Sequence, residues 1–300
     1  METMPATIDV FLFSIGAAVL WGLNPVFMKK GLERDGNSIL ASVVAVIVSF
    51  SLFVTIATVV YGPTESYLGV SRTGAAIFLF GGVIGSSLGR IVVYVGVDRV
   101  GVSVNTAILN TRPLFAGLLA VALLNEPITG WLGLGIVVIV AGVVLVSLSR
   151  GGDIRGWSWY ELGFPLFAAI AYGAGNVVRR YGFTVTQTDV LSAFVLNEFA
   201  AMGVLVGYAL VRHGPGVLVA SRRTYALFAV GGLLSSLALL SLFTALSRGP
   251  VIVVDPLAGT SPLFAALFTV LFLKRVERVT RGVVVGAAVI ILGVVFVALA

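Results

Sequence analysis

The 300-residue chain contains no cysteine, and only 11% of its residues are charged. The lack of cysteine excludes disulfide bonds, thiolate chemistry and cysteine-based zinc sites. A soluble domain carries about 25% charged residues, so the scarcity of charge argues against a soluble protein. The sequence also lacks HExxH, nucleophile-elbow and P-loop motifs, which argues against an enzyme. We therefore expect no catalytic residues, no metal and no cofactor.

Apolar sequence fills the chain instead, since 59% of its residues are hydrophobic. About 20 apolar residues form a helix long enough to cross a bilayer core of about 30 Å. Breaks in the apolar pattern predict ten such helices, at 9–30, 38–61, 74–97, 102–124, 130–149, 159–181, 188–211, 225–247, 251–273 and 280–299. The fold class predicted is an all-α integral membrane protein, multi-pass in the plasma membrane and surrounded by membrane lipids.

The excess of 19 basic over 13 acidic residues would suggest a nucleic-acid partner in a soluble chain. Here the charges cluster at the ends of apolar runs, where Lys and Arg anchor helices and set topology. We therefore expect no nucleic-acid partner.

Short motifs recur in the two halves of the chain in the same order. AAVLWG (Ala17–Gly22) matches AAIAYG (Ala168–Gly173) at an offset of 151, and TRPLFA (111–116) matches TSPLFA (260–265) at 149. EPIT, which starts at Glu126, matches ERVT, which starts at Glu277. The chain is thus predicted to be a duplicated five-helix unit, with one repeat over 1–150 and the other over 151–300. Because five is odd, the second copy must enter the membrane from the opposite face, as in many secondary transporters.

These motifs also carry a resemblance to a known family. LWGLNPVFMKKGL, AILNTRPLFAGLLAVALLNEPIT and LAGTSPLFAALFTVLFLKRVERVT, with the repeated glycine-rich helices LGIVVIVAGVVLV and GAAVIILGVVFVALA, resemble the ten-helix EamA-type members of the drug/metabolite transporter superfamily. The resemblance implies a transporter whose central cavity is lined by helices 1, 3, 4, 6, 8 and 9. It implies substrates that range over amino acids, other metabolites, nucleotide sugars and drugs.

The function predicted is secondary transport of a small metabolite by alternating access, with an anion or an amino acid as substrate. Coupling to protons and substrate exchange are both open. Two alternatives stand beside it: a broad-specificity exporter of hydrophobic compounds, and a membrane scaffold that transports nothing. The oligomeric state is open, and a homodimer is one alternative.

Arginines deep in the predicted helices are the first candidates for substrate contacts. A charged residue at the centre of a membrane helix costs about 2.5–3.5 kcal/mol and normally faces a cavity or a partner. Arg112 lies in the middle of 102–124, with Asn105 two turns earlier and Asn110 beside that face, and Arg90 lies within 74–97. An arginine fork with amide donors suits a carboxylate or phosphate. The alternatives for Arg112 are packing against helix-end carbonyls and a structural ion pair with Glu198.

Helices 1 and 6 each carry an aromatic residue and an amide on roughly one face. Trp21 and Asn24 form this pair in helix 1, and Tyr172 and Asn176 form it in helix 6. Both pairs are predicted to line the cavity. An interfacial aromatic with an interhelical hydrogen bond is the alternative.

Two acidic residues are candidates for proton coupling, because buried carboxylates can bind and release protons. Glu198 lies in the middle of helix 7, and Asp255 lies early in helix 9. For Asp255 the alternative is a helix N-cap or first-turn acid.

Charge bias and family resemblance predict opposite orientations. With Arg90 and Arg112 set aside, 13 basic residues follow odd-numbered helices and 4 follow even-numbered ones. The positive-inside rule therefore places both termini outside, whereas the resemblance implies both inside. Two adjacent pairs, expected to be helix-end anchors on opposite faces, contribute to this count: Lys29 with Lys30, and Arg179 with Arg180.

Overall fold

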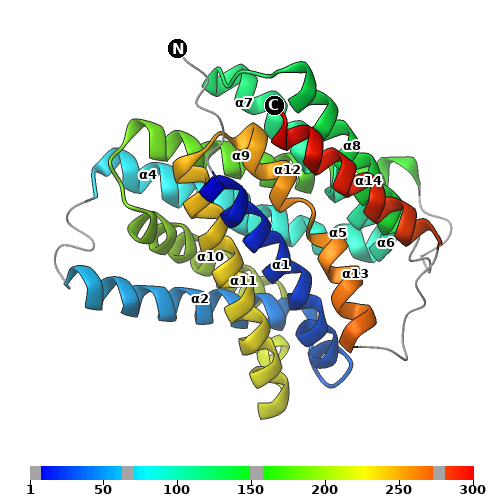
Figure 1. The fold of residues 1–300 in the computed structure, drawn as a ribbon. Helices are drawn as coiled ribbons and strands as arrows, with labels where there is room; N and C mark the ends of the chain where they lie inside the picture. The colour runs from blue at the N-terminus through cyan, green and yellow to red at the C-terminus, as the bar shows by residue number, and fades with distance from the viewer. Residues whose placement is uncertain (1–7, 63–69, 149–157, 273–280) are drawn as a thin grey trace.

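The computed structural model describes residues 8–62, 70–148, 158–272 and 281–300. In these ranges ten helical spans are long and apolar enough to cross a membrane, and every regular element is a helix. Figure 1 shows the spans gathered into one bundle. The predicted all-α membrane fold is confirmed, and the second span, expected at 38–61, is observed at Ser38–Tyr61.

Five spans come from each half of the chain. The first five are α1 (Ile8–Leu32), α2 (Ser38–Tyr61), the composite α4 (Arg72–Gly81), η1 (Gly82–Leu88) and α5 (Gly89–Val100), the composite α6 (Val102–Leu109) and α7 (Arg112–Leu124), and α8 (Gly130–Leu148). The second five are η2 (Trp159–Leu162) with α9 (Gly163–Val185), α10 (Val190–His213), α11 (Arg222–Arg248), the composite α12 (Val251–Ala258) and α13 (Ser261–Phe272), and α14 (Arg281–Ala298), with η3 (Pro215–Leu218) before α11.

The fourth and ninth spans are broken at the repeated TRP and TSP motifs. Expected as single helices over 102–124 and 251–273, they are interrupted at 110–111 and 259–260. Pro113 and Pro262 follow the breaks, and proline has no N–H to donate to the preceding turn. Broken helices of this kind line substrate sites in transporters, because they leave backbone groups and helix ends at mid-membrane.

The third span is interrupted differently, by the π-helix η1. The Ser87 hydroxyl donates to the Gly82 carbonyl, five residues earlier, at 2.9 Å. A Cβ added at Gly85 would lie 2.9 Å from the Cα of Gly175 in α9. The backbones of η1 and α9 therefore touch, and only glycine fits on both sides of this crossing.

Helix packing relates the two halves. α1 packs against α11 and α13, while its counterpart α9 packs against α4–α5 and α7. The last spans of the two halves, α8 and α14, lie side by side (Figure 1). Added Cβ atoms at Gly142 and Gly286 would lie within 3.0 Å of the facing backbone. This arrangement fits two inverted repeats, and the expected boundary at 150/151 lies outside the described residues.

The two membrane faces are named here by their loops. The basic face is where odd-numbered spans end, and the terminal face is where even-numbered spans end. Lys29 and Lys30 lie in the last turn of α1, at the basic face, as expected for helix-end residues.

Candidate functional site: a central cavity between the repeats

A cavity of about 250 Å³ lies between the two halves. It is lined from spans 1, 3, 4, 6, 8 and 9, the set that the family resemblance implied. Six of the predicted site residues line it: Trp21, Arg90, Asn110, Arg112, Tyr172 and Asn176. Four further polar residues that we had not selected line it too: Ser86, Arg179, Ser235 and Ser261.

Arg112 begins α7 at the break in the fourth span, and its partner is Asp255. Its Nε atom donates to Asp255 Oδ2 at 3.0 Å, and the Asn176 amide donates to Oδ1 of the same carboxylate. Asp255 is fully buried and lies in the middle of α12, whose N-cap is Pro250. Arg112 is therefore not paired with Glu198, and Asp255 does not cap its helix.

Arg179 was expected at a helix end, and the structure corrects this. α9 continues to Val185 instead of ending at 181, so Arg179 is inside the bundle and only 2% exposed. It donates to Asn176 Oδ1 at 2.7 Å, Asn197 Oδ1 at 3.1 Å and Ser86 Oγ at 2.8 Å, and it lies over the Phe243 ring. Its spacing from Asn176 indicated this position, because residues three apart share a helix face. Without Arg179, the terminal face keeps 3 of the 4 basic residues counted there, which strengthens the charge bias.

Glu198 lies at the other end of this polar network. The Asn197 amide donates to Glu198 Oε1 at 3.1 Å and to Ser86 Oγ at 3.0 Å. Glu198 is buried, and the charges acting on it are those of Arg90 and Arg179. A continuous set of contacts thus joins the ion pair of Arg112 to Glu198 and crosses between the repeats.

Arg90 borders the cavity without a salt bridge to any described residue. Its neighbours are Tyr172 and Tyr94, and Glu198 acts on it electrostatically. Three arginines and two carboxylates make up the charged groups of the network, so the site has a formal excess of one positive charge. The described residues contain no group of three or more His, Asp or Glu able to hold a metal ion.

The two remaining predicted residues lie away from this cavity. Asn24 lines a neighbouring cavity, where its amide donates to the Ser235 hydroxyl and its Oδ1 is buried without a partner in the described structure. Asn105 is 1% exposed and packs against Gly96 of α5. The break after Leu109 changes the helical register, so Asn105 and Arg112 do not share a face as predicted.

Two further cavities follow the central one toward the basic face, each sharing lining residues with its neighbour. A cavity of about 330 Å³ shares Trp21, Arg90 and Ser235 with the central one. A third, of about 250 Å³, shares Ser38 and Tyr94 with the second and extends to ends of spans at the basic face, with Asp98 and His213 in its lining.

Toward the terminal face, apolar side chains fill the bundle. Leu242, Leu246 and Ile252 are at most 1% exposed and belong to one buried cluster. The cavities thus extend from the central site toward the basic face, whereas packed apolar side chains lie on the side of the terminal face.

Comparisons with known proteins agree with this architecture. The model of the EamA-like transporter family matches residues 10–148 and again 159–299. A solved structure described only as "Crystal structure of protein" superimposes with a TM-score of 0.79 at 15% identity, covering 97% of this chain and 96% of its own. No curated protein sequence matches. Because the family model matches once in each half and together spans nearly the whole chain, the protein belongs to the EamA-like transporter family.

Proposed function

We propose that the protein is a secondary transporter that carries small organic anions across the plasma membrane by alternating access through the central cavity. One observation carries this proposal: two arginines border the same cavity, one without a salt bridge to a described residue and the other paired through its Nε alone. Arg90 has no salt bridge with a described residue, and Arg112 uses only its Nε on Asp255. The Nη groups of Arg112 are thus left for a ligand, in a site with a formal excess of one positive charge.

The chemistry of the lining supports a carboxylate or phosphate group on the substrate. A guanidinium binds such groups through paired N–H donors, in shorter and stronger hydrogen bonds than neutral donors form. Trp21 and Tyr172 supply aromatic faces for the rest of the molecule, and Asn110 supplies an amide at the helix break. These groups would hold the substrate between the repeats, where both faces can be reached in turn.

Proton coupling is assigned to the two buried carboxylates. An anion that binds Arg112 competes with Asp255 for the same guanidinium, and a protonated Asp255 no longer competes. Proton uptake by Asp255 would therefore favour anion uptake, which is cotransport. Glu198, joined to Arg179 through Asn197, is the second carboxylate in the same network.

Uptake of labelled organic anions by purified protein in liposomes tests the proposal. Arg112→Ala and Arg90→Ala should each lower the initial rate at least tenfold, with Arg112→Lys intermediate because lysine keeps the charge and loses the fork. Arg99→Ala removes an exposed ion pair with Glu161 at the basic face and is the matched control.

Each negative result has a defined meaning. If both cavity variants transport like the parent, the anion site is wrong. Uptake that ignores an imposed proton gradient would exclude coupling through Asp255 and Glu198. Transport of hydrophobic compounds alone would favour an exporter of such compounds, and no transport of any panel member would favour a scaffold.

A further inference from the structure

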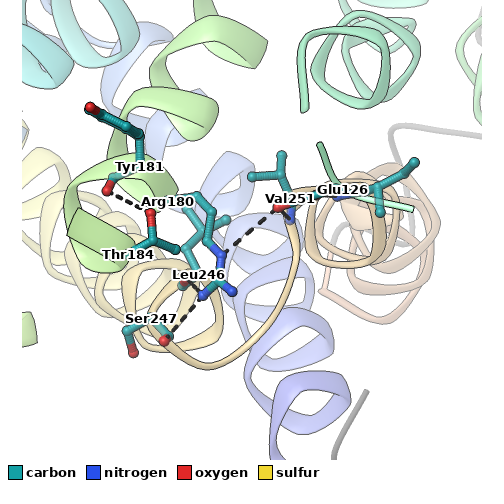
Figure 2. A network of polar contacts seen from close by, with 8 residues as sticks. Glu126, Arg180, Tyr181, Thr184, Leu246, Ser247 and Val251 are labelled. Carbon is teal, nitrogen blue, oxygen red and sulfur yellow. Dashed lines mark hydrogen bonds and ion pairs between the residues drawn. The ribbon is translucent and has the colours of Figure 1, made fainter. Parts of the chain in front are cut away.

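At the terminal face, a loop of the first repeat meets α12 of the second (Figure 2). Glu126, between α7 and α8, is 9% exposed. Its Oε1 accepts the Val251 N–H and its Oε2 accepts the Ile252 N–H, both at 3.0 Å. These N–H groups belong to the first turn of α12 and have no partner within the helix. A carboxylate of one repeat therefore caps a buried helix of the other.

Arg180 joins a third helix to this junction. Its Nε lies 3.8 Å from Glu126 Oε1, and its Nη1 donates to the Leu246 carbonyl at 2.9 Å and the Ser247 carbonyl at 3.3 Å. Those carbonyls end α11, as Figure 2 shows. Adjacent in sequence, Arg179 and Arg180 thus serve different places: Arg179 the central network and Arg180 the terminal junction.

The first repeat holds α12 at two points. Glu126 holds its N-terminus, and Arg112 holds Asp255. Val251 and Asp255 are four residues apart, about 6 Å along a helix. Every residue of α12 is buried, so it is an internal element that links the terminal closure to the substrate arginine.

We propose that Glu126 and Arg180 form the gate that closes the terminal face, and that α12 couples this gate to anion binding at Arg112. The inference rests on the alternating-access function proposed above. An anion on the Nη groups of Arg112 weakens the attraction of this arginine for Asp255 and so loosens the inner hold on α12. Opening to the terminal face then requires α12 to leave Glu126, and the pathway stays closed until it does.

The cysteine-free sequence makes this gate directly testable. A single cysteine at Ser261, which lines the central cavity, gives one labelling site for a membrane-impermeant maleimide. Sealed proteoliposomes receive the reagent from either side, and separate variants with a cysteine at exposed Arg223 or Gly130 report which face is outside. Ser261→Cys with an intact gate, the parent for this assay, should label from the basic face. It should label at least tenfold more slowly from the terminal face.

The gate variants should change only the rate of labelling from the terminal face. Glu126→Ala should raise terminal-face labelling at least tenfold, Arg180→Gln should raise it less, and Glu126→Gln, which keeps an acceptor for α12, should remain closer to the parent. Glu161→Gln, which breaks the ion pair at the basic face, is the control and should leave the terminal-face labelling rate unchanged. Where Glu126→Ala does not elute as a monodisperse protein, Arg180→Gln decides.

Unchanged terminal-face labelling in the folded gate variants would overturn the gate. Because labelling needs no substrate, this result is separable from the proposed function. A gate response without anion uptake would refute the anion proposal alone, and normal anion uptake with unchanged labelling would refute the gate alone.

Discussion

The ion pair of Arg112 and Asp255 predicts a large coupling energy between the two side chains. The joined nitrogen and oxygen are 3.0 Å apart, and the side chains are 18% and 0% exposed. At an effective dielectric constant of about 20, unit charges at that distance attract by roughly 5 kcal/mol, an attraction that desolvation offsets in part. Removing one partner of a buried pair costs about 3–5 kcal/mol, because the other charge is left uncompensated.

A double-mutant cycle measures this coupling. We expect Arg112→Met to be the more destabilising single change, because it leaves the fully buried carboxylate of Asp255 alone. Asp255→Asn should cost less, since Arg112 faces a cavity that can hydrate it. The double variant should be more stable than the sum of the single effects predicts, by at least about 2 kcal/mol.

Reversible unfolding in mixed detergent–SDS micelles, followed by tryptophan fluorescence, gives the four free energies of the cycle. Arg99 and Glu161, 3.5 Å apart with Arg99 59% exposed, form the control pair, for which surface ion pairs predict about 0–1 kcal/mol. Additivity within about 0.5 kcal/mol at Arg112 and Asp255 would refute the reasoning.

Three further predictions concern packing, the network and the gate. Gly142→Leu should destabilise the protein by about 1–3 kcal/mol in the same unfolding assay, because the side chain would meet the backbone of α14. Gly203→Ala, which has open space around it, is the control and should be neutral or stabilising by up to about 1 kcal/mol. Arg179→Gln should abolish anion uptake and lower thermal stability, since it removes the guanidinium that donates to Asn176 Oδ1, Asn197 Oδ1 and Ser86 Oγ. A parent-like melting temperature would contradict this. Burial raises the pKa of Glu126 above its ordinary 4.5, against the opposing effects of the α12 N–H groups and Arg180. An opened, hydrated Glu126 would have an ordinary pKa, so the closed state binds the proton more tightly and acidification should slow terminal-face labelling relative to basic-face labelling. Glu126→Gln should remove that pH dependence, and a parent that labels faster in acid would contradict the sign.

The helical spans could be predicted because the cost of burying charge in a membrane is a local property of each segment. Ten apolar runs therefore appear as ten spans, with edges displaced by a few residues. The breaks at 110–111 and 259–260 were missed although Pro113 and Pro262 marked them. The apolar sequence continues on both sides of each break, and proline is compatible with both kinked and interrupted helices.

Part of the cavity lining could be predicted from the sequence, and its pairings could not. Arg112, Asn176 and Asp255 were all selected, yet the partner of Arg112 lies 143 residues away, in a repeat whose docking is not encoded in local composition. Arg179 was assigned to a helix end because α9 was expected to stop too early. An error of four residues in the predicted end of one helix thus placed a buried arginine at the surface in the prediction.

The π-helix η1 marks a difference in length between corresponding segments of the two repeats. GGVIGSSL (81–88) in the first repeat matches GGLLSSL (231–237) in the second once Gly85 is set aside as an additional residue. α11 runs through the matching segment as an ordinary α-helix, whereas η1 contains Gly85 in a π turn, which holds one residue more than an α turn. The two segments thus differ in length by one residue. Beyond that residue lie Ser86, which contacts Arg179, and Arg90, whose counterpart at the same offset is Leu239. A difference of one residue in length therefore separates two corresponding helices that line the same cavity. One presents Arg90 to it, and the other presents Leu239 at the matching position.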